Sequence, residues 1–440
     1  MKRLGFVMVG LALVAVLVFA WLWRLSETGD DAGQSQSQSQ SQAQAQPNPQ
    51  AQAPGASADA TTHVERGAYL ARAGNCALCH TVRGGPAYAG GRAIDTPFGT
   101  LYTSNLTPAP RTGLGAWTAQ DFWRALHHGR SRDGRMLYPA FPYTNYTRVT
   151  RADSDALFAY LRSLAPVERD NLPHALTWPV RTQAALAVWR ALYFRPGAQP
   201  VDAAQTPEWN RGAYLVQGLG HCSACHSARD ALGGSNLMDL SGGMIPMQNW
   251  YAPSLASRTE AGVAEWSVAD IVQLLHTGRA GPASALGPMA EVVRHSTQHL
   301  SEADLQAMAV FLKAIPQTQT SAEAPATARV VSARGERVYG EQCAQCHGDR
   351  GQGVPGAYPP LAGNRAVLLP QTANLVQAVI YGGFAPATDG NPRPYGMPPF
   401  AVVLGDADVA AVLTYIRNAW GQSGGPVSEL DVARQRSSRP

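Results

Sequence analysis

The hydrophobic positions of this chain fall into one continuous run at the start and a series of helical patterns farther on. Residues 4–23 are apolar almost throughout and follow Lys2 and Arg3. About twenty such residues cross a bilayer as a helix, and a basic start favours the cytoplasmic side for the N-terminus. Residues 1–25 are therefore predicted to be an N-terminal transmembrane helix. Cleavage after residues 18–20, as in a signal peptide, is the alternative.

Residues 26–62 have no hydrophobic period and repeat Ser-Gln and Ala-Gln pairs. Such a stretch cannot form a core, so it is predicted to be a low-complexity linker. Beyond it, apolar residues return at helical spacing, and amphipathic helices are expected at 153–164, 301–315 and 406–420. The pattern indicates a mostly α-helical protein.

The helical part of the chain consists of three repeats. Each is predicted to open with a helix that contains an Arg-Gly pair, at Arg66, Arg211 and Arg334, and to close with one of the amphipathic helices. Repeats of this size are separate domains rather than turns of a solenoid. The predicted organisation is a first domain at 63–165, a connecting segment at 166–205, a second domain at 206–315, a linker at 316–328, a third domain at 329–422 and a polar tail at 423–440.

The connecting segment has a helical pattern of its own at residues 181–194. Packing of this helix on the first domain is the favoured interpretation, and a docking surface for a partner is the alternative. In the first two domains, Thr118 and Ser267 each precede an acidic residue three positions on, which predicts helix N-caps there.

Charge excludes one class of function. The 440 residues carry a formal net charge of only +4, without a long basic run, which argues against binding to nucleic acid. No nucleophile-base pair or phosphate-binding loop stands out either, so the chain by itself is predicted not to be an enzyme.

The cysteines indicate which cofactor the chain binds. All six belong to three C-x-x-C-H motifs, and this pattern is the attachment signature of c-type haem. Two thiols three positions apart lie on one side of a helical turn, where both can reach one porphyrin. A thiol redox site or a zinc site would not account for a histidine after every pair. The motif predicts three covalently attached haem c groups held by Cys76, Cys79, Cys222, Cys225, Cys343 and Cys346, with His80, His226 and His347 as iron ligands.

A second iron ligand is expected in an electron carrier, and methionine is the common choice. Met397, between Gly396 and two prolines, is the only methionine of the third domain. Met289 is the candidate in the second domain, since it stands in a Gly-Pro-Met sequence after the helix expected to start at Ser267, the middle helix of that domain.

The first domain leaves alternatives open. Its only methionine is Met136, which is the predicted ligand, yet alignment of the repeats puts Phe141 opposite Met289. His127 and His128, expected to be partly exposed at a helix end, are possible replacements, and an open iron is the third possibility. Surface positions are expected for His63, His174, His221, His295 and His299.

From residue 64 onward the chain resembles the triheme cytochrome c subunits of membrane-bound bacterial dehydrogenases. The resemblance rests on sequences around the first motif and on Thr96-Pro-Phe-Gly-Thr-Leu-Tyr102, Leu137-Tyr-Pro-Ala-Phe-Pro-Tyr143, Tyr358-Pro-Pro-Leu-Ala-Gly-Asn364 and Arg393-Pro-Tyr-Gly-Met397-Pro-Pro-Phe400. It implies three tandem class I cytochrome c domains. It also implies methionine at the position of Phe141, where this chain departs from the family.

That family serves alcohol, gluconate, sorbitol, fructose and aldehyde dehydrogenases, and the Pro-Ala-Phe-Pro variant is similar to cytochromes that accompany molybdenum hydroxylases. The resemblance implies electron transfer from a dehydrogenase subunit of flavin, quinoprotein or molybdenum type, with a small third subunit as a further partner. The expected acceptor is ubiquinone, a terminal oxidase or a soluble cytochrome. The expected location is the bacterial inner membrane, with the haem domains in the periplasm. Alternatives are a free-standing shuttle, an oxidase-associated cytochrome or, with an open first iron, a haem enzyme.

Overall fold

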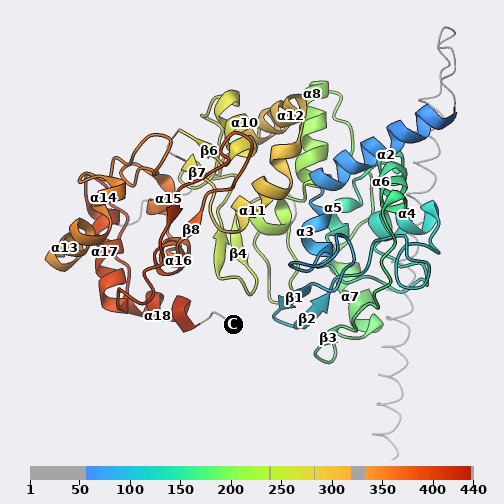
Figure 1. Ribbon diagram of the computed structural model, residues 1–440, viewed down its shortest axis with the longest axis horizontal. Coiled ribbons are helices and arrows are strands. Elements are labelled where there is room, and N and C mark those ends of the chain that lie inside the picture. The colour runs from blue at the N-terminus through green and yellow to red at the C-terminus, as the bar shows by residue number, and fades with distance from the viewer. Residues whose placement is uncertain (1–55, 237–238, 282, 319–331, 438–440) are drawn as a thin grey trace, which may run out of the picture. The chain divides into compact units, whose positions relative to one another are not determined.

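A computed structural model describes residues 56–236, 239–281, 283–318 and 332–437 (Figure 1). The chain divides into two compact units. Of the described residues, the first comprises 56–202 with 217–221 and 229–236, and the second comprises the remainder. The predicted transmembrane helix at 1–25 lies outside the described residues. Within the described part of the chain, no helix is both long and apolar enough to cross a membrane.

The same crossing of two helices occurs three times. In the first unit α2 (Ala56–Ala73) packs on α6 (Arg151–Ser163). In the second unit α8 (Pro207–Ala213) packs on α12 (Glu302–Lys313), and α13 (Ala333–Gln342) packs on α17 (Asp406–Asn418) (Figure 1). These pairs are the opening and closing helices that the sequence predicts for each repeat.

A glycine lies at each crossing. A Cβ atom added to Gly67, Gly212 or Gly335 would lie 1.9, 2.0 or 2.2 Å from a carbonyl oxygen of the opposite helix. No side chain fits at such a distance, so glycine is required for the close approach of the two helices. This explains why the arginine at the start of each repeat is followed by a glycine.

The arginine of each pair contacts an aspartate of the closing helix. Arg211 binds Asp304 through two hydrogen bonds of 2.7 Å. Arg334 binds Asp408 through one hydrogen bond of the same length. In the first unit Asp153, with only 3% of its side chain exposed, accepts from Arg66. The Arg-Gly pair therefore fixes both the distance and the register of the crossing.

A middle helix lies between each opening and closing helix: α4 (Ala119–His128), α10 (Val268–Thr277) and α16 (Ala373–Tyr381). Thr118 and Ser267 cap the first two by accepting from the backbone N–H three residues on, as predicted. Each middle helix ends at a glycine with positive φ, Gly129, Gly278 or Gly382. The chain turns there into the segment that contains the candidate methionine.

Strands are short. In the first unit β1 (Ala93–Thr96), β2 (Gly99–Tyr102) and β3 (Ala175–Leu176) form one antiparallel sheet. In the second unit β4 (Gly243–Ile245) pairs with β5 (Trp250–Ala252). The hairpins β6–β7 (Arg279–Ala280 with Ala283–Ser284) and β8–β9 (Gly383–Phe384 with Gly396–Met397) follow the middle helices α10 and α16.

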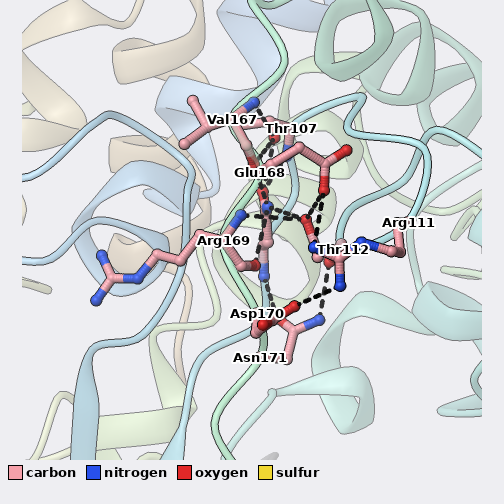
Figure 2. A network of polar contacts seen from close by, with 9 residues as sticks. Thr107, Arg111, Thr112, Val167, Glu168, Arg169, Asp170 and Asn171 are labelled. Carbon is pink, nitrogen blue, oxygen red and sulfur yellow. Dashed lines mark hydrogen bonds and ion pairs between the residues drawn. The ribbon is translucent and has the colours of Figure 1, made fainter.

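The connecting segment packs on the first domain. Its strand β3 joins the sheet, and its helix α7 (Gln183–Tyr193) buries Leu186 and Ala187 against Met136. Figure 2 shows a further polar network that ties residues 167–171 to the loop that contains Thr107 and Thr112. The favoured interpretation of this segment is therefore the one that the structure adopts.

Two boundaries differ from the prediction. Helix α2 begins at Ala56, inside the predicted linker at 26–62, because the alternating alanines there are strong helix formers.

The polar tail at 423–440 contains α18 (Glu429–Ser437), which packs on α16 and α17 and buries Val432 completely. Its start is marked by Ser428, whose side chain accepts from the N–H of Asp431 at 3.1 Å. A Ser-x-x-Asp pattern was therefore the signal for this helix.

Candidate haem sites

Each C-x-x-C-H motif forms a short helical turn. The turns are α3 (Cys76–His80) in the first domain, α9 (Ser223–His226) in the second and α14 (Ala344–His347) in the third. The six cysteines, all of them in described residues, are free of disulfides and at least partly exposed. Both thiols of each motif are thus available on one helical turn, as covalent attachment of a porphyrin requires.

The three motif histidines are oriented in the same way. The Nδ1 atom of His80 lies 2.7 Å from the carbonyl oxygen of Ser104, that of His226 lies 2.7 Å from Pro253, and that of His347 lies 3.0 Å from Pro359. A backbone carbonyl accepts only from a protonated Nδ1, so the Nε2 atom is left with its lone pair for iron. Burial also lowers the pKa of all three histidines, which favours the neutral form that binds metal.

The thiols are not activated for redox chemistry. Burial raises the pKa of Cys76 and of Cys222 to about 12, and that of Cys343 to about 11, with the second cysteine of each motif adding to the shift. Thiol-disulfide exchange requires a thiolate, which such pKa values disfavour. These sites fit covalent attachment of haem better than a dithiol redox site.

The carbonyl that orients His80 is held by the network of Figure 2. Ser104 precedes Asn105, whose buried side-chain amide donates to the carbonyl of Val167 at 2.7 Å. Its oxygen accepts from the N–H and the hydroxyl of Thr107 at 2.9 and 2.7 Å, and Thr107 is labelled in Figure 2. The connecting segment therefore helps to fix the iron-binding histidine of the first domain. Sequence reasoning did not predict this role for Asn105.

A different set of residues fixes the carbonyl that orients His226. The N–H and carbonyl of Tyr251, two residues before Pro253, pair with the side chain of Asn374, both at 2.8 Å. On the other side of Pro253, the N–H of Ser254 donates to Glu260 at 2.7 Å. Asn374 belongs to α16, so the third domain contributes to the surroundings of the second motif. Nothing in the sequence pattern indicated this contact.

The candidate methionines of the second and third domains are partly exposed. Met289 lies in the first turn of α11 (Pro288–His295), after Gly287, where a Cβ atom would meet the ring of Trp250 at 2.8 Å. Met397 lies in β9 and packs against the edge of the third domain's core. Both side chains retain surface that the protein does not cover, as an iron ligand requires.

Met136 has different surroundings. Only 1% of its surface is exposed, and it forms a cluster with Leu186 and Ala187 of α7. Gln183 of the same helix accepts from the N–H of Met136 at 2.7 Å and donates to its carbonyl at 3.2 Å. The side chain and the backbone of Met136 are both engaged with the connecting helix.

His127 and His128 are buried, with 2% of each exposed, and not partly exposed as expected. The ring of His127 stacks on Trp123 at 4.2 Å, and it contacts the ring of His128 edge-on. The backbone carbonyl of His128 also accepts a hydrogen bond of 2.7 Å from the buried Arg190 of α7, so the connecting helix packs at this helix end.

Four of the five remaining histidines, His63, His174, His295 and His299, are exposed as expected. His221 is only partly exposed: its Nε2 lies 3.4 Å from the carbonyl of Gly74, its ring contacts Tyr146, and burial lowers its pKa.

The chain is similar to known cytochromes over most of its length. It matches the cytochrome c family at residues 64–165 and 332–420, which include the first and third motifs. It is 37% identical to the cytochrome c subunit of alcohol dehydrogenase (quinone) from Gluconacetobacter polyoxogenes, over 85% of this chain and 84% of that protein. The chain belongs to the family of dehydrogenase cytochrome c subunits.

Two further relatives have a similar identity to this chain. The gluconate 2-dehydrogenase cytochrome c subunit of Pantoea cypripedii is 38% identical over 85% of this chain and 89% of that protein. One of the subunits of nicotinate dehydrogenase from Pseudomonas putida is 41% identical over 81% of this chain, although the match spans only 30% of that protein. The predicted resemblance is thereby confirmed.

The family implies covalent haem c, and the residues present fit it. When bound, haem supplies an iron that cycles between the ferric and ferrous states. The protein side of each site is an attachment turn with two thiols and a neutral histidine whose ring is held by a carbonyl.

Proposed function

We propose that this chain carries three covalent haem c groups and passes electrons from a dehydrogenase catalytic subunit to ubiquinone, a terminal oxidase or a soluble cytochrome. The observation that carries the proposal is the threefold recurrence of one arrangement. Each C-x-x-C-H turn follows a glycine-mediated helix crossing and presents a histidine fixed through Nδ1. The domain boundaries proposed are 63–165, 206–315 and 329–422.

The ligands proposed for the second and third irons are His226 with Met289 and His347 with Met397. A thioether stabilises ferrous iron and raises its potential, which suits a carrier that receives electrons. At each of these sites the protein would hold the haem, set its reduction potential and exclude water. The chain acts in electron transfer and needs a partner for substrate oxidation.

The partner proposed is a larger dehydrogenase subunit with a flavin, quinone or molybdenum cofactor, with or without a small third subunit. Support comes from relatives named as subunits of alcohol, gluconate, fructose and nicotinate dehydrogenases. The location proposed is the inner membrane with an N-terminal anchor and periplasmic haem domains, supported by the apolar run at residues 4–23.

The haem count tests the first part of the proposal. Exported full-length protein, denatured and freed of non-covalent cofactors, should retain three haems by pyridine haemochrome assay and by intact mass. Ser substitution of both cysteines of one motif, Cys76 with Cys79, Cys222 with Cys225 or Cys343 with Cys346, should remove one haem in each case. A fully matured protein with two haems or fewer would contradict the proposal.

Purification in mild detergent tests the partnership. We expect a larger subunit with its own redox cofactor to accompany the chain, and substrate of that subunit to reduce all three haems of the complex. Reduction of the isolated chain by an alcohol, a sugar or nicotinate would show that it needs no partner and would overturn this part.

A further inference from the structure

The first domain contains a hairpin whose paired ends match those of one in the second domain, although its loop is one residue longer. After the glycine that ends the middle helix, Arg130 pairs with Met136, just as Arg279 pairs with Ser284. The next residue donates its N–H to the carbonyl of that glycine in both, from Leu137 at 2.8 Å and from Ala285 at 2.7 Å. Met136 therefore corresponds to Ser284, which is exposed.

Five residues farther along, Phe141 corresponds to Met289. Position in the hairpin does not identify a ligand by itself, because in the third domain Met397 stands in the strand, opposite Gly383. The surroundings of the side chain are therefore needed to tell whether it can reach an iron. Met136 is covered by Leu186 and Ala187 and is 1% exposed, so its sulfur has no open surface to present to a ring.

Phe141 lies on the side of the first attachment turn. It is partly exposed, and its ring is 5.3 Å from that of Tyr146. The hydroxyl of Tyr146 donates to the carbonyl of Gly74, two residues before Cys76, at 3.2 Å. Burial raises the pKa of Tyr146, and the nearby Cys76 and Cys79 raise it further, which agrees with a position beside both thiols.

The two histidine alternatives fail by the same criterion as Met136. His127 and His128 are each 2% exposed, and the ring of His127 lies flat against Trp123 at 4.2 Å. A ring buried to this extent has no open surface to present to an iron. In the second domain, His276 corresponds to His127, and that domain also contains the candidate ligand Met289.

We propose that the first haem iron has no side-chain ligand opposite His80 and that Phe141 lines an open position there, which binds small neutral ligands such as carbon monoxide. This inference rests on the proposed three-haem function. A phenyl ring offers neither a lone pair for iron nor a hydrogen-bond donor for an anion, so the ferrous form should bind a neutral diatomic ligand at this haem alone.

Carbon monoxide titration of the dithionite-reduced full-length chain tests the proposal. We expect one carbon monoxide for every three haems, and a methionine-iron charge-transfer band in the oxidised protein at the intensity of two haems. Phe141→Met should remove carbon monoxide binding and raise that band to the intensity of three haems. Phe141→Leu, which widens the site, should keep the binding and speed recombination after photolysis.

Met136→Leu is the matched control, since it nearly conserves the volume of the core side chain. It should leave carbon monoxide stoichiometry and the charge-transfer band unchanged. A wild-type protein that binds no carbon monoxide, a bis-histidine spectrum at one haem, or loss of a methionine band in Met136→Leu would each overturn the proposal. Retention of full binding in correctly folded Phe141→Met would do the same.

The haem count keeps this test separate from that of the proposed function. Fewer than three covalent haems would defeat the three-haem proposal whatever the ligand binding. Three haems, all closed to carbon monoxide, would leave electron transfer intact and defeat only the open site.

Discussion

The loops that follow Gly129 and Gly278 have the same hairpin register but different surroundings. In the first domain, α7 of the connecting segment covers the hairpin and buries Met136. In the second domain, the equivalent Ser284 is exposed, and Met289 at the start of α11 is partly exposed. What packs on the loop thus decides whether its methionine lies in the core or keeps an uncovered surface that could face an iron.

The largest effect that we expect in this comparison follows Met136→Ala and Met289→Ala. Truncation of buried Met136 should lower the free energy of unfolding by about 2–5 kcal/mol, without change in any haem spectrum. Met289→Ala should instead remove one methionine-iron band, lower the potential of one haem and open it to carbon monoxide.

Chemical denaturation and spectroelectrochemical titration of both holoproteins would measure these effects. If Met136→Ala lowers a haem potential while stability is unchanged, the two loops are alike and the comparison fails.

The second prediction concerns the proximal side of the first haem. Asn105→Ala removes the amide that joins the loop of Ser104 to Val167 and leaves buried partners unsatisfied. We expect a loss of about 2–3 kcal/mol, because several hydrogen bonds of one buried group are lost together. Freer rotation of His80 should also broaden the electron paramagnetic resonance signal of one haem.

Asp95→Asn is the control for Asn105→Ala, since Asp95 lies in the same unit but is exposed and accepts a single hydrogen bond, from Thr100. Equal losses in the two variants would show that the Asn105 network has no special effect on the first site.

A third prediction tests the contact between the first hairpin and α7. Gln183→Ala removes both hydrogen bonds to the backbone of Met136. The expected loss is about 1–2 kcal/mol, smaller than for Met136→Ala, since no cavity forms in the cluster. Gln199→Ala, which removes one side-chain bond to Arg148, is the comparison. An effect of Gln183→Ala on any haem potential would speak against a purely structural role for this hairpin.

The smallest effect is expected at the second site. Asn374→Ala frees the N–H and carbonyl of Tyr251 and should cost about 1 kcal/mol. Because Tyr251 is two residues from the carbonyl that orients His226, the variant should slightly shift the potential of one haem. Asn374→Asp keeps the acceptor for the Tyr251 N–H and should retain part of the effect. An unchanged potential in both variants would limit Asn374 to domain packing.

The sequence predicted the attachment turns and their histidines because the C-x-x-C-H pattern is local: five consecutive residues contain the whole chemical requirement. The opening, middle and closing helices were predictable for a similar reason, since helical periodicity and caps such as Thr118 act within a few residues. The helix α18 was missed because its polar composition hid the single buried Val432.

Only the tertiary structure decided what surrounds each loop. The sequence by itself determined that the first domain has one methionine, and sequence reasoning therefore made Met136 the candidate ligand. The burial of Met136 depends on Leu186 and Ala187, about fifty residues later in the chain, which no local pattern can bring to it. The same holds for Asn105 with Val167 and for Asn374 with Tyr251, because long-range packing sets which groups meet.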